Sequence, residues 1–267
     1  QQQPGLQIAP EDVWAEAITA EGTKRLQNML DEMSDEQKRQ VAKGLEGHVH
    51  EAWSGKEAQY ANFVLQKVIV QLPPKDNEFV FREMLAHDVV TTAMNKYGCR
   101  ILQRLIEHFV EVDTRKLIEP LLRDQEKLAG LMFDRFGNFV VQCVLEHGAS
   151  EHRAIIGNVL LELIDEDFAE AIKHKNCSHV IQRAIFYCQE ALQRALVERV
   201  EYVCAICHRW PPIKKSQYGS FVVTEAKSWR HKRGEVKQVP RKVLVAEHLP
   251  GSVLPGAAPT PPPSAPC

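Results

Sequence analysis

The sequence has no run of 18 apolar residues, so we expect no segment that spans a membrane as a helix. The opening QQQPGLQ lacks both the basic and the apolar region of a secretory signal. The chain also lacks an initial Met, which indicates a fragment. The seven cysteines are odd in number and are not framed at disulfide spacings. This pattern fits a reduced compartment, and we expect a cytoplasmic protein.

The net charge is negative outside the C-terminal segment. Residues 226–267 hold seven Lys or Arg against two acidic residues, which leaves 26 basic and 33 acidic residues in 1–225, a net charge of −7. A protein that grips nucleic acid by charge alone needs a basic surface. The composition therefore excludes a general polyanion-binding protein.

A repeated phrase is what the sequence does contain. Its copies are EGTKRLQNM (21–29), YANFVLQKV (60–68), YGCRILQRL (97–105), FGNFVVQCV (136–144), NCSHVIQRA (176–184) and YGSFVVTEA (218–226). Their reference positions are Thr23, Asn62, Cys99, Asn138, Ser178 and Ser220, which are 39, 37, 39, 40 and 42 residues apart. A fixed period of this length is the signature of a repeat protein.

The repeats are expected to be helical. Residues 116–133 and 152–172, which lie between phrases, place apolar residues at helical spacing, and no strand-like alternation competes with them. Two or three short helices fit in each unit, and none could bury its apolar face alone, so neighbours must stack. The sequence predicts an all-α solenoid of about six repeats, with HEAT or armadillo repeats as the general structural alternative.

Composition sets the expected domain limits. Residues 15–226 would form the repeat domain, after a flexible tail at 1–14. Residues 227–249 form a basic segment that holds a short helix at 243–249, and the Pro-rich residues 250–267 are expected to be disordered.

One face of each repeat carries a recurring set of side chains. Positions i and i+4 of a helix lie one turn apart on the same face. The pairs there are Thr23/Gln27, Asn62/Gln66, Cys99/Gln103, Asn138/Gln142, Ser178/Gln182 and Ser220/Thr224. The residues beside them are Lys24, Phe63, Arg100, Phe139, His179 and Phe221. A structural solenoid has no reason to repeat Gln five times, whereas Asn and Gln can match the edge of a base, and Phe, His or Arg can stack on its face.

These phrases resemble the Pumilio (PUF) family of single-stranded RNA-binding proteins over residues 15–226. YGCRILQRLIEH (97–108) and FGNFVVQCVLEHG (136–148) are close to the fifth and sixth repeats of that family. The resemblance implies a right-handed superhelix that usually has eight repeats, so the first two are missing in a fragment or in a shortened array.

The resemblance also implies a base preference. Asn62/Gln66 and Asn138/Gln142 resemble uracil-reading pairs, whereas Cys99/Gln103 and Ser178/Gln182 resemble adenine-reading pairs. Because RNA runs antiparallel to the chain in this family, we expect a core of 5′-AUAU-3′, with a weak 3′ adenine at Thr23/Gln27.

Two repeats depart from the family pattern. Members commonly have Glu where this chain has Gln182, and Ser220 and Thr224 replace an Asn and Gln pair. The guanine of the family's usual UGU element is therefore not expected here.

The resemblance predicts a non-enzymatic monomer without cofactor or metal, which binds messenger 3′ untranslated regions and recruits regulatory proteins. One alternative is a protein-interaction solenoid without RNA readout, which the net charge favours. Another is a nucleolar PUF-like factor that binds RNA with little base preference.

Other motifs have simpler explanations. Cys204, Cys207 and His208 match a haem-attachment pattern by chance, and as zinc ligands they lack a second pair. Cys99 has no orienting His, so it is not expected to be a nucleophile. The basic segment at 227–249 could add phosphate contacts that do not depend on sequence.

Overall fold

The computed structural model describes residues 8–206 and 213–234, and every regular element in these ranges is helical. Five units contain three helices each. The units are α1 (Pro10–Ala17), α2 (Ala20–Glu32) and α3 (Asp35–Leu45); α4 (Val49–Ser54), α5 (Ala58–Gln71) and α6 (Glu78–Leu85); α7 (Val89–Ala93), α8 (Gly98–His108) and α9 (Glu111–Leu122); α10 (Gln125–Phe133), α11 (Gly137–His147) and α12 (Ser150–Glu162); and α13 (Asp165–Lys173), α14 (Cys177–Tyr187) and α15 (Glu190–Ala205). The last unit contributes η3 (Ile213–Lys215) and α16 (Gln217–Lys232), and η1 (Pro74–Asp76) lies between α5 and α6.

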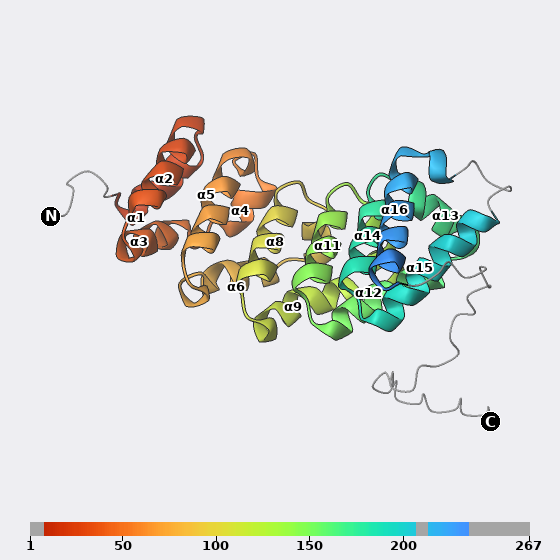
Figure 1. Ribbon diagram of the computed structural model, residues 1–267. Coiled ribbons are helices and arrows are strands. Elements are labelled where there is room, and N and C mark those ends of the chain that lie inside the picture. The colour runs from red at the N-terminus through yellow and green to blue at the C-terminus, as the bar shows by residue number, and fades with distance from the viewer. Residues whose placement is uncertain (1–7, 207–212, 235–267) are drawn as a thin grey trace, which may run out of the picture.

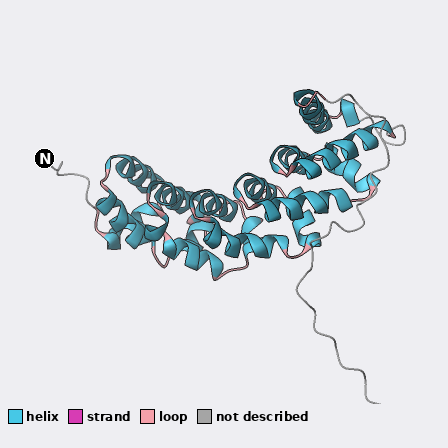
Figure 2. Ribbon diagram, turned by 60° about the horizontal axis from the view of Figure 1, so that its bottom comes forward, coloured by secondary structure: helices cyan, strands magenta, loops and turns pink. Residues whose placement is uncertain are grey.

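The helices form stacked rows rather than a bundle (Figure 1). The second helices of the units contact one another in order, α2 with α5, α5 with α8, α8 with α11, α11 with α14, and α14 with α16. A parallel row of third helices is joined by contacts of α9 with α12 and of α12 with α15. Figure 2 shows the resulting arc, with a row of helices seen end-on along its inner side. The predicted α-solenoid is confirmed.

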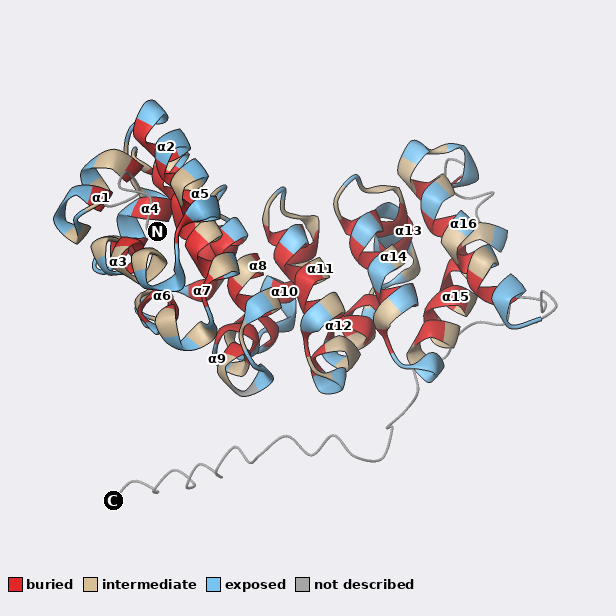
Figure 3. Cartoon of the chain, turned by 60° about the vertical axis from the view of Figure 1, so that its left-hand side comes forward, coloured by how far each residue is buried: buried red, intermediate tan, exposed pale blue. Residues whose placement is uncertain are grey.

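The core lies between the rows. The two residues that follow the exposed aromatic or cationic position are buried in α5, α8, α11 and α14: Val64 and Leu65, Ile101 and Leu102, Val140 and Val141, Val180 and Ile181. Figure 3 shows the same pattern, with buried positions between the helices and exposed positions on the outer surfaces. Each unit therefore depends on its neighbours for burial.

A short turn opens each central second helix. The Asn95 Oδ1 accepts from the backbone N–H groups of Tyr97 and Gly98, at 2.8 and 3.0 Å. A Cβ on Gly98 would lie 2.6 Å from the Thr92 carbonyl oxygen, so glycine allows α7 and α8 to approach closely. The turn thus fixes where α8 begins.

The observed helices refine the predicted boundaries. Residues 116–133 and 152–172 each contain a break, at Arg123–Asp124 and at Leu163–Ile164. The predicted domain limits of 15 and 226 fall inside α1 and α16. The predicted helix at 243–249 and the Pro-rich tail lie outside the described residues.

In the described part of the chain, no single helix is long and apolar enough to cross a membrane. Taken together, α10 and α11 have the length and the apolar composition of a membrane-spanning segment, but the two helices are bent by 109° at the break between them.

Candidate nucleic-acid interface

The predicted site residues form a regular row on the second helices, and their exposure follows their position in the repeat. The reference residue is buried in five helices, at Thr23, Asn62, Cys99, Asn138 and Ser178. The residue that follows it is exposed, with Phe63 and Phe221 at 50% and Phe139 at 40%. The Gln four positions later is half-buried in α2, α5, α11 and α14 and buried in α8.

Where the reference residue is Asn, the two amides are joined. The Gln66 Nε2 donates to the Asn62 Oδ1 at 2.8 Å, and the Gln142 Nε2 donates to the Asn138 Oδ1 at 2.9 Å. The Asn Nδ2 in turn donates to a backbone carbonyl one turn earlier, of Ala58 or Asp134. Each Gln is therefore held in one orientation, and its amide still carries an acceptor oxygen and a second N–H.

Where the reference residue is short, Gln bonds to the backbone instead. The Gln103 Nε2 donates to the Cys99 carbonyl at 2.8 Å, the Gln182 Nε2 to the Ser178 carbonyl at 3.1 Å, and the Gln27 Nε2 to the Thr23 carbonyl at 3.2 Å. The Ser178 Oγ is buried and has no hydrogen-bond partner among the described residues. The row thus contains two kinds of pair, which differ in the space and the groups they offer.

The stacking candidates of neighbouring repeats approach one another. The Arg100 guanidinium carbon lies 5.2 Å from the centre of the Phe139 ring. The His179 ring meets Tyr218 of the next unit edge-on, with 6.3 Å between the ring centres. Flat or cationic side chains are therefore in contact between α8 and α11 and between α14 and α16.

The helices α16 and α2, at the two ends of the row, have the same row positions but different hydrogen-bonding groups there. In α16, the Ser220 Oγ donates to the Gln217 carbonyl at 2.7 Å, and the Thr224 Oγ1 donates to the Ser220 carbonyl at 2.8 Å. In α2, the Thr23 Oγ1 donates to the Tyr60 carbonyl at 3.1 Å, and Lys24 stands exposed at the stacking position. Hydroxyls engaged with the backbone leave fewer groups for a base.

A row of cationic side chains next to the predicted site was not predicted from the sequence. Lys96, Arg135 and Lys175 are exposed in the turns before α8, α11 and α14, each three residues before the reference position. The Lys96 Nζ lies 4.9 Å from the centre of the Tyr97 ring, and the Arg135 guanidinium carbon lies 4.3 Å from that of Phe136. Their constant offset in three successive repeats was the signal that could have identified them.

The cysteines in and near the row are buried. Burial raises the pKa of the Cys99 thiol to about 11, so the thiol is protonated at neutral pH. This agrees with its interpretation as a small uncharged contact rather than a nucleophile. Of the haem-like motif, Cys204 is half-buried at the end of α15, whereas Cys207 and His208 lie outside the described residues.

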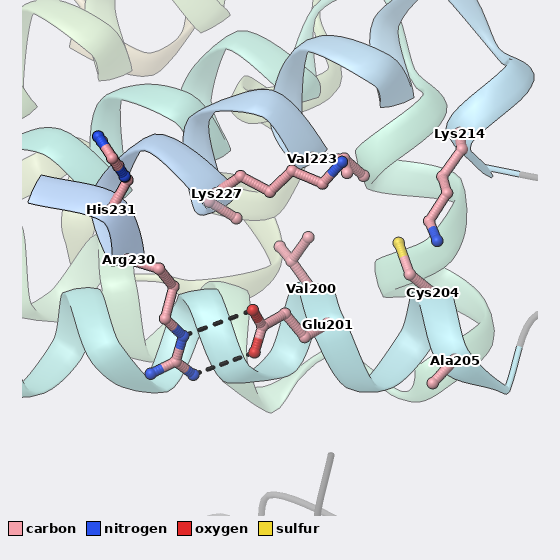
Figure 4. Close-up of a pocket in the computed structure, with 10 residues that line it drawn as sticks. Val200, Glu201, Cys204, Ala205, Lys214, Val223, Lys227, Arg230 and His231 are labelled. Carbon is pink, nitrogen blue, oxygen red and sulfur yellow. Dashed lines mark hydrogen bonds and ion pairs between the residues drawn. The ribbon is translucent and has the colours of Figure 1, made fainter. Parts of the chain in front are cut away.

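A cavity of about 280 Å³ lies between α15 and α16 (Figure 4). Val200 and Val223 form part of its wall, and the Arg230 side chain is paired with Glu201 at 3.0 Å. None of the row residues lines this cavity, so it is separate from the candidate interface.

Curated relatives share part of the chain. It is 28% identical over 124 residues to Pumilio homology domain family member 4 of Saccharomyces cerevisiae, a match that covers 46% of this chain and 14% of that protein. It is 27% identical over 165 residues to the putative pumilio homolog 8, chloroplastic, of Arabidopsis thaliana, covering 62% of this chain and 30% of that protein. The chain thus spans less than a third of the length of these two relatives.

Solved structures share the fold. The structure of PUF-8 in complex with PBE-RNA matches with a TM-score of 0.67 and 22% identity, over 84% of this chain and 64% of that one. The Puf3 RNA binding domain bound to the Cox17 RNA 3′ UTR recognition sequence site B matches with a TM-score of 0.68 and 20% identity, over 82% and 62%.

The family model of the Pumilio-family RNA binding repeat matches residues 26–45, 59–85, 88–122, 127–161 and 170–200. These segments make up more than half of the chain and follow the helical units from α2 to α15. The chain therefore belongs to the Pumilio (PUF) family of repeat proteins.

Proposed function

We propose that this chain binds single-stranded RNA in a sequence-selective manner, with one base for each repeat. The observation that carries the proposal is the regular row itself, in which a buried short residue, an exposed flat or cationic residue and an oriented Gln recur from helix to helix. Stacking surfaces bind any base, whereas an oriented amide distinguishes one base edge from another. The neighbouring PUF structures were solved with RNA, which supports this ligand class.

The two kinds of pair support the proposal of alternating bases. In α5 and α11 the Asn side chain fills the space beside Gln, which suits the smaller pyrimidine, and the Gln amide offers uracil both a donor and an acceptor. In α8 and α14 the short Cys99 and Ser178 leave room for a purine. The proposed core is 5′-AUAU-3′, read from Ser178 back to Asn62, with a weak 3′ adenine at Thr23.

The row of three cations before α8, α11 and α14 could bind the phosphates of the RNA backbone. Lys96, Arg135 and Lys175 are exposed and spaced by one repeat, as successive phosphates along the row would require. Phosphate contacts position a nucleic acid without specifying its sequence. In this proposal the three cations supply affinity and the Gln row supplies selectivity, which reconciles RNA binding with the net charge of −7 in residues 1–225.

The biological role follows from this activity. The targets would be 3′ untranslated regions of messenger RNA, bound in the cytoplasm by a monomer that recruits regulatory proteins. No part of the proposal requires catalysis.

The test is a selection of bound sequences from a random RNA pool, with the wild-type chain beside the Gln66→Ala/Gln142→Ala variant. The control is Gln125→Ala/Gln189→Ala, which removes two exposed Gln side chains outside both the row and the register of the three cations. We expect an AUAU-containing motif for wild type and control, with the two uracils weakened in the first variant.

No enriched motif from a folded wild-type chain would refute selective binding. Binding that depends steeply on salt but selects no motif would favour the nucleolar type of factor. Absence of any RNA binding would favour a protein-interaction solenoid.

A further inference from the structure

A cluster of metal-binding side chain types lies next to the base-reading row and has no role in it. Glu107 on α8 and Cys143 and His147 on α11 place one donor atom each within 4.8 Å of one another. Glu107 follows Gln103 by one turn, and Cys143 and His147 follow Phe139 by one and two turns. The cluster therefore lies beyond the row, toward the C-terminal ends of α8 and α11.

The helices hold these donors in place. Cys143 and His147 are four residues apart on one helix, the spacing at which two side chains of a helix bind the same zinc ion in H-E-x-x-H sites. The buried Cys143 Sγ is 3.6 Å from the Gln103 carbonyl oxygen, so the sulfur faces α8, where Glu107 lies one turn further on. Donors around a tetrahedral zinc are roughly 3.3–3.8 Å apart, given bonds of about 2.0–2.3 Å. Small side-chain rotations would bring the three donors to that spacing.

Two carboxylates and two arginines surround the cluster. Glu107 is paired with Arg104 at 2.6 Å, and Glu146 is paired with Arg183 at 2.9 Å and lies 3.7 Å from the His147 Nε2. Burial raises the pKa of the Cys143 thiol, and the Glu107 and Glu146 carboxylates raise it further, against the opposing effect of Arg104. A dication bound here would be attracted by the two carboxylates and opposed by the two arginines, and Glu107 would exchange Arg104 for the metal.

We propose that Glu107, Cys143 and His147 bind one Zn²⁺ ion, which links the unit of α8 to the unit of α11. The thiol proton is released to solvent as the Zn–S bond forms, and a water molecule completes a four-coordinate site. A sulfur, a nitrogen and an oxygen donor suit zinc, whereas magnesium and calcium require oxygen donors. The site is independent of RNA recognition, since none of its three side chains belongs to the row.

The test uses the full chain, first stripped of metal, in a Zn²⁺ titration against a chromophoric chelator. Co²⁺ is the second probe, because a thiolate bound to Co²⁺ gives a charge-transfer absorption band. We expect one high-affinity Zn²⁺ per chain, a thermal midpoint raised by Zn²⁺, and a Co²⁺–thiolate band. Cys143→Ser should abolish the band, and His147→Ala and Glu107→Gln should weaken zinc binding by at least tenfold.

Two cysteine variants serve as controls. Cys188→Ser removes a buried thiol elsewhere in the chain, and Cys204→Ser removes a member of the Cys204, Cys207 and His208 motif. Both should retain the zinc and the Co²⁺ band. If Cys204→Ser loses them, or if wild-type protein binds no Zn²⁺, the proposal is overturned.

His147 is exposed, so its substitution should leave the fold intact even if Cys143→Ser does not fold. Unchanged zinc affinity in a folded His147→Ala variant would also overturn the proposal.

Discussion

Three inner units and the two outermost units build the start of their second helices differently. Before α8, α11 and α14, the side chains of Asn95, Asp134 and His174 each accept from two backbone N–H groups. α2 and α16 begin instead with a hydroxyl cap, in which the Thr19 Oγ1 or the Ser216 Oγ accepts one N–H at 3.0 Å. These three helices carry a Gln in the row, as α2 does with Gln27, whereas α16 has Thr224.

The comparison shows that fold and recognition chemistry vary separately. α16 packs on α14 as the inner helices pack on one another, and its Phe221 is exposed like Phe63. The apolar positions are retained because stacking requires them, whereas the polar positions are free to change without loss of the fold. We therefore expect substitutions in inner and outer units to have different consequences.

The largest expected difference concerns stability. Leu102 in α8 and Leu30 in α2 are both fully buried. We expect Leu102→Ala to lower the free energy of unfolding by about 2–5 kcal/mol, because the cavity opens between two supporting neighbours. Leu30→Ala should cost less of the global stability, since a terminal unit can open locally. Denaturant unfolding measures both, and equal losses would show that the units do not act through nearest-neighbour contacts.

The next effect concerns RNA affinity at the stacking positions. Phe139→Ala should weaken binding of an AUAU-containing RNA by roughly 5- to 150-fold, which corresponds to about 1–3 kcal/mol of stacking. Phe221→Ala is the matched change in the last unit and should have a smaller effect, because the Ser220 and Thr224 hydroxyls donate to the backbone and leave fewer groups for a base. Fluorescence anisotropy measures both affinities. A larger effect from Phe221→Ala would reverse the proposed division between inner and outer units.

A third change alters preference rather than affinity. Gln182→Glu replaces an amide that can donate and accept with a carboxylate that only accepts. We expect the base read at α14 to move from adenine toward guanine, which offers N–H donors to a carboxylate, by roughly 1–3 kcal/mol. Gln189→Glu, an exposed change outside the row, controls for the added negative charge. An unchanged preference in competition binding would show that the pairing rule does not hold in this chain.

The smallest expected effect is a pH dependence of stability that only one of the three inner turns should show. The His174 Nδ1 accepts the N–H groups of Asn176 and Cys177, at 3.2 and 3.4 Å, as a carboxylate or amide does in the other two turns. Burial lowers the pKa of His174, with a further contribution from Lys175. As pH falls below about 6.5, the unfolded state binds the proton first, so the free energy of unfolding decreases.

Above that pH both states are neutral, and His174 makes no pH-dependent contribution. We expect His174→Asn to reduce the acid sensitivity measured by unfolding between pH 7 and pH 5. His152, whose pKa is also lowered by burial, would account for part of the remainder. His231→Asn, an exposed change in α16, is the control, and an identical pH profile for His174→Asn would exclude the turn as its source.

Much of this architecture could be predicted because its signal repeats. A single Gln on a helix surface carries little information, but Gln66, Gln103 and Gln142 at one register define both the helix face and the period. The boundaries of the first helices were harder to predict, since α7 has five residues and cannot show a helical period of its own. The hydrogen bonds that each Gln makes to its reference residue also depend on backbone geometry, which the spacing of residues in the sequence does not reveal.

Other groups were missed for a different reason. Lys96, Arg135 and Lys175 stand outside the repeated phrase, so an alignment centred on the reference residues did not single them out. Glu107 and Cys143 are far apart in sequence and become neighbours only when α8 packs on α11. A cluster whose residues come together only when two helices pack cannot be recognised from the spacing of residues in the sequence.

The contact of Arg100 with Phe139 has a mechanical consequence. A base inserted between them needs about two stacking layers of 3.4 Å each, whereas the guanidinium carbon is 5.2 Å from the ring centre. Either Arg100 swings aside or α8 and α11 move apart, and in the second case the arc becomes more open at that joint. In that case the curvature of the solenoid at the joint between α8 and α11 would differ with and without a base between Arg100 and Phe139.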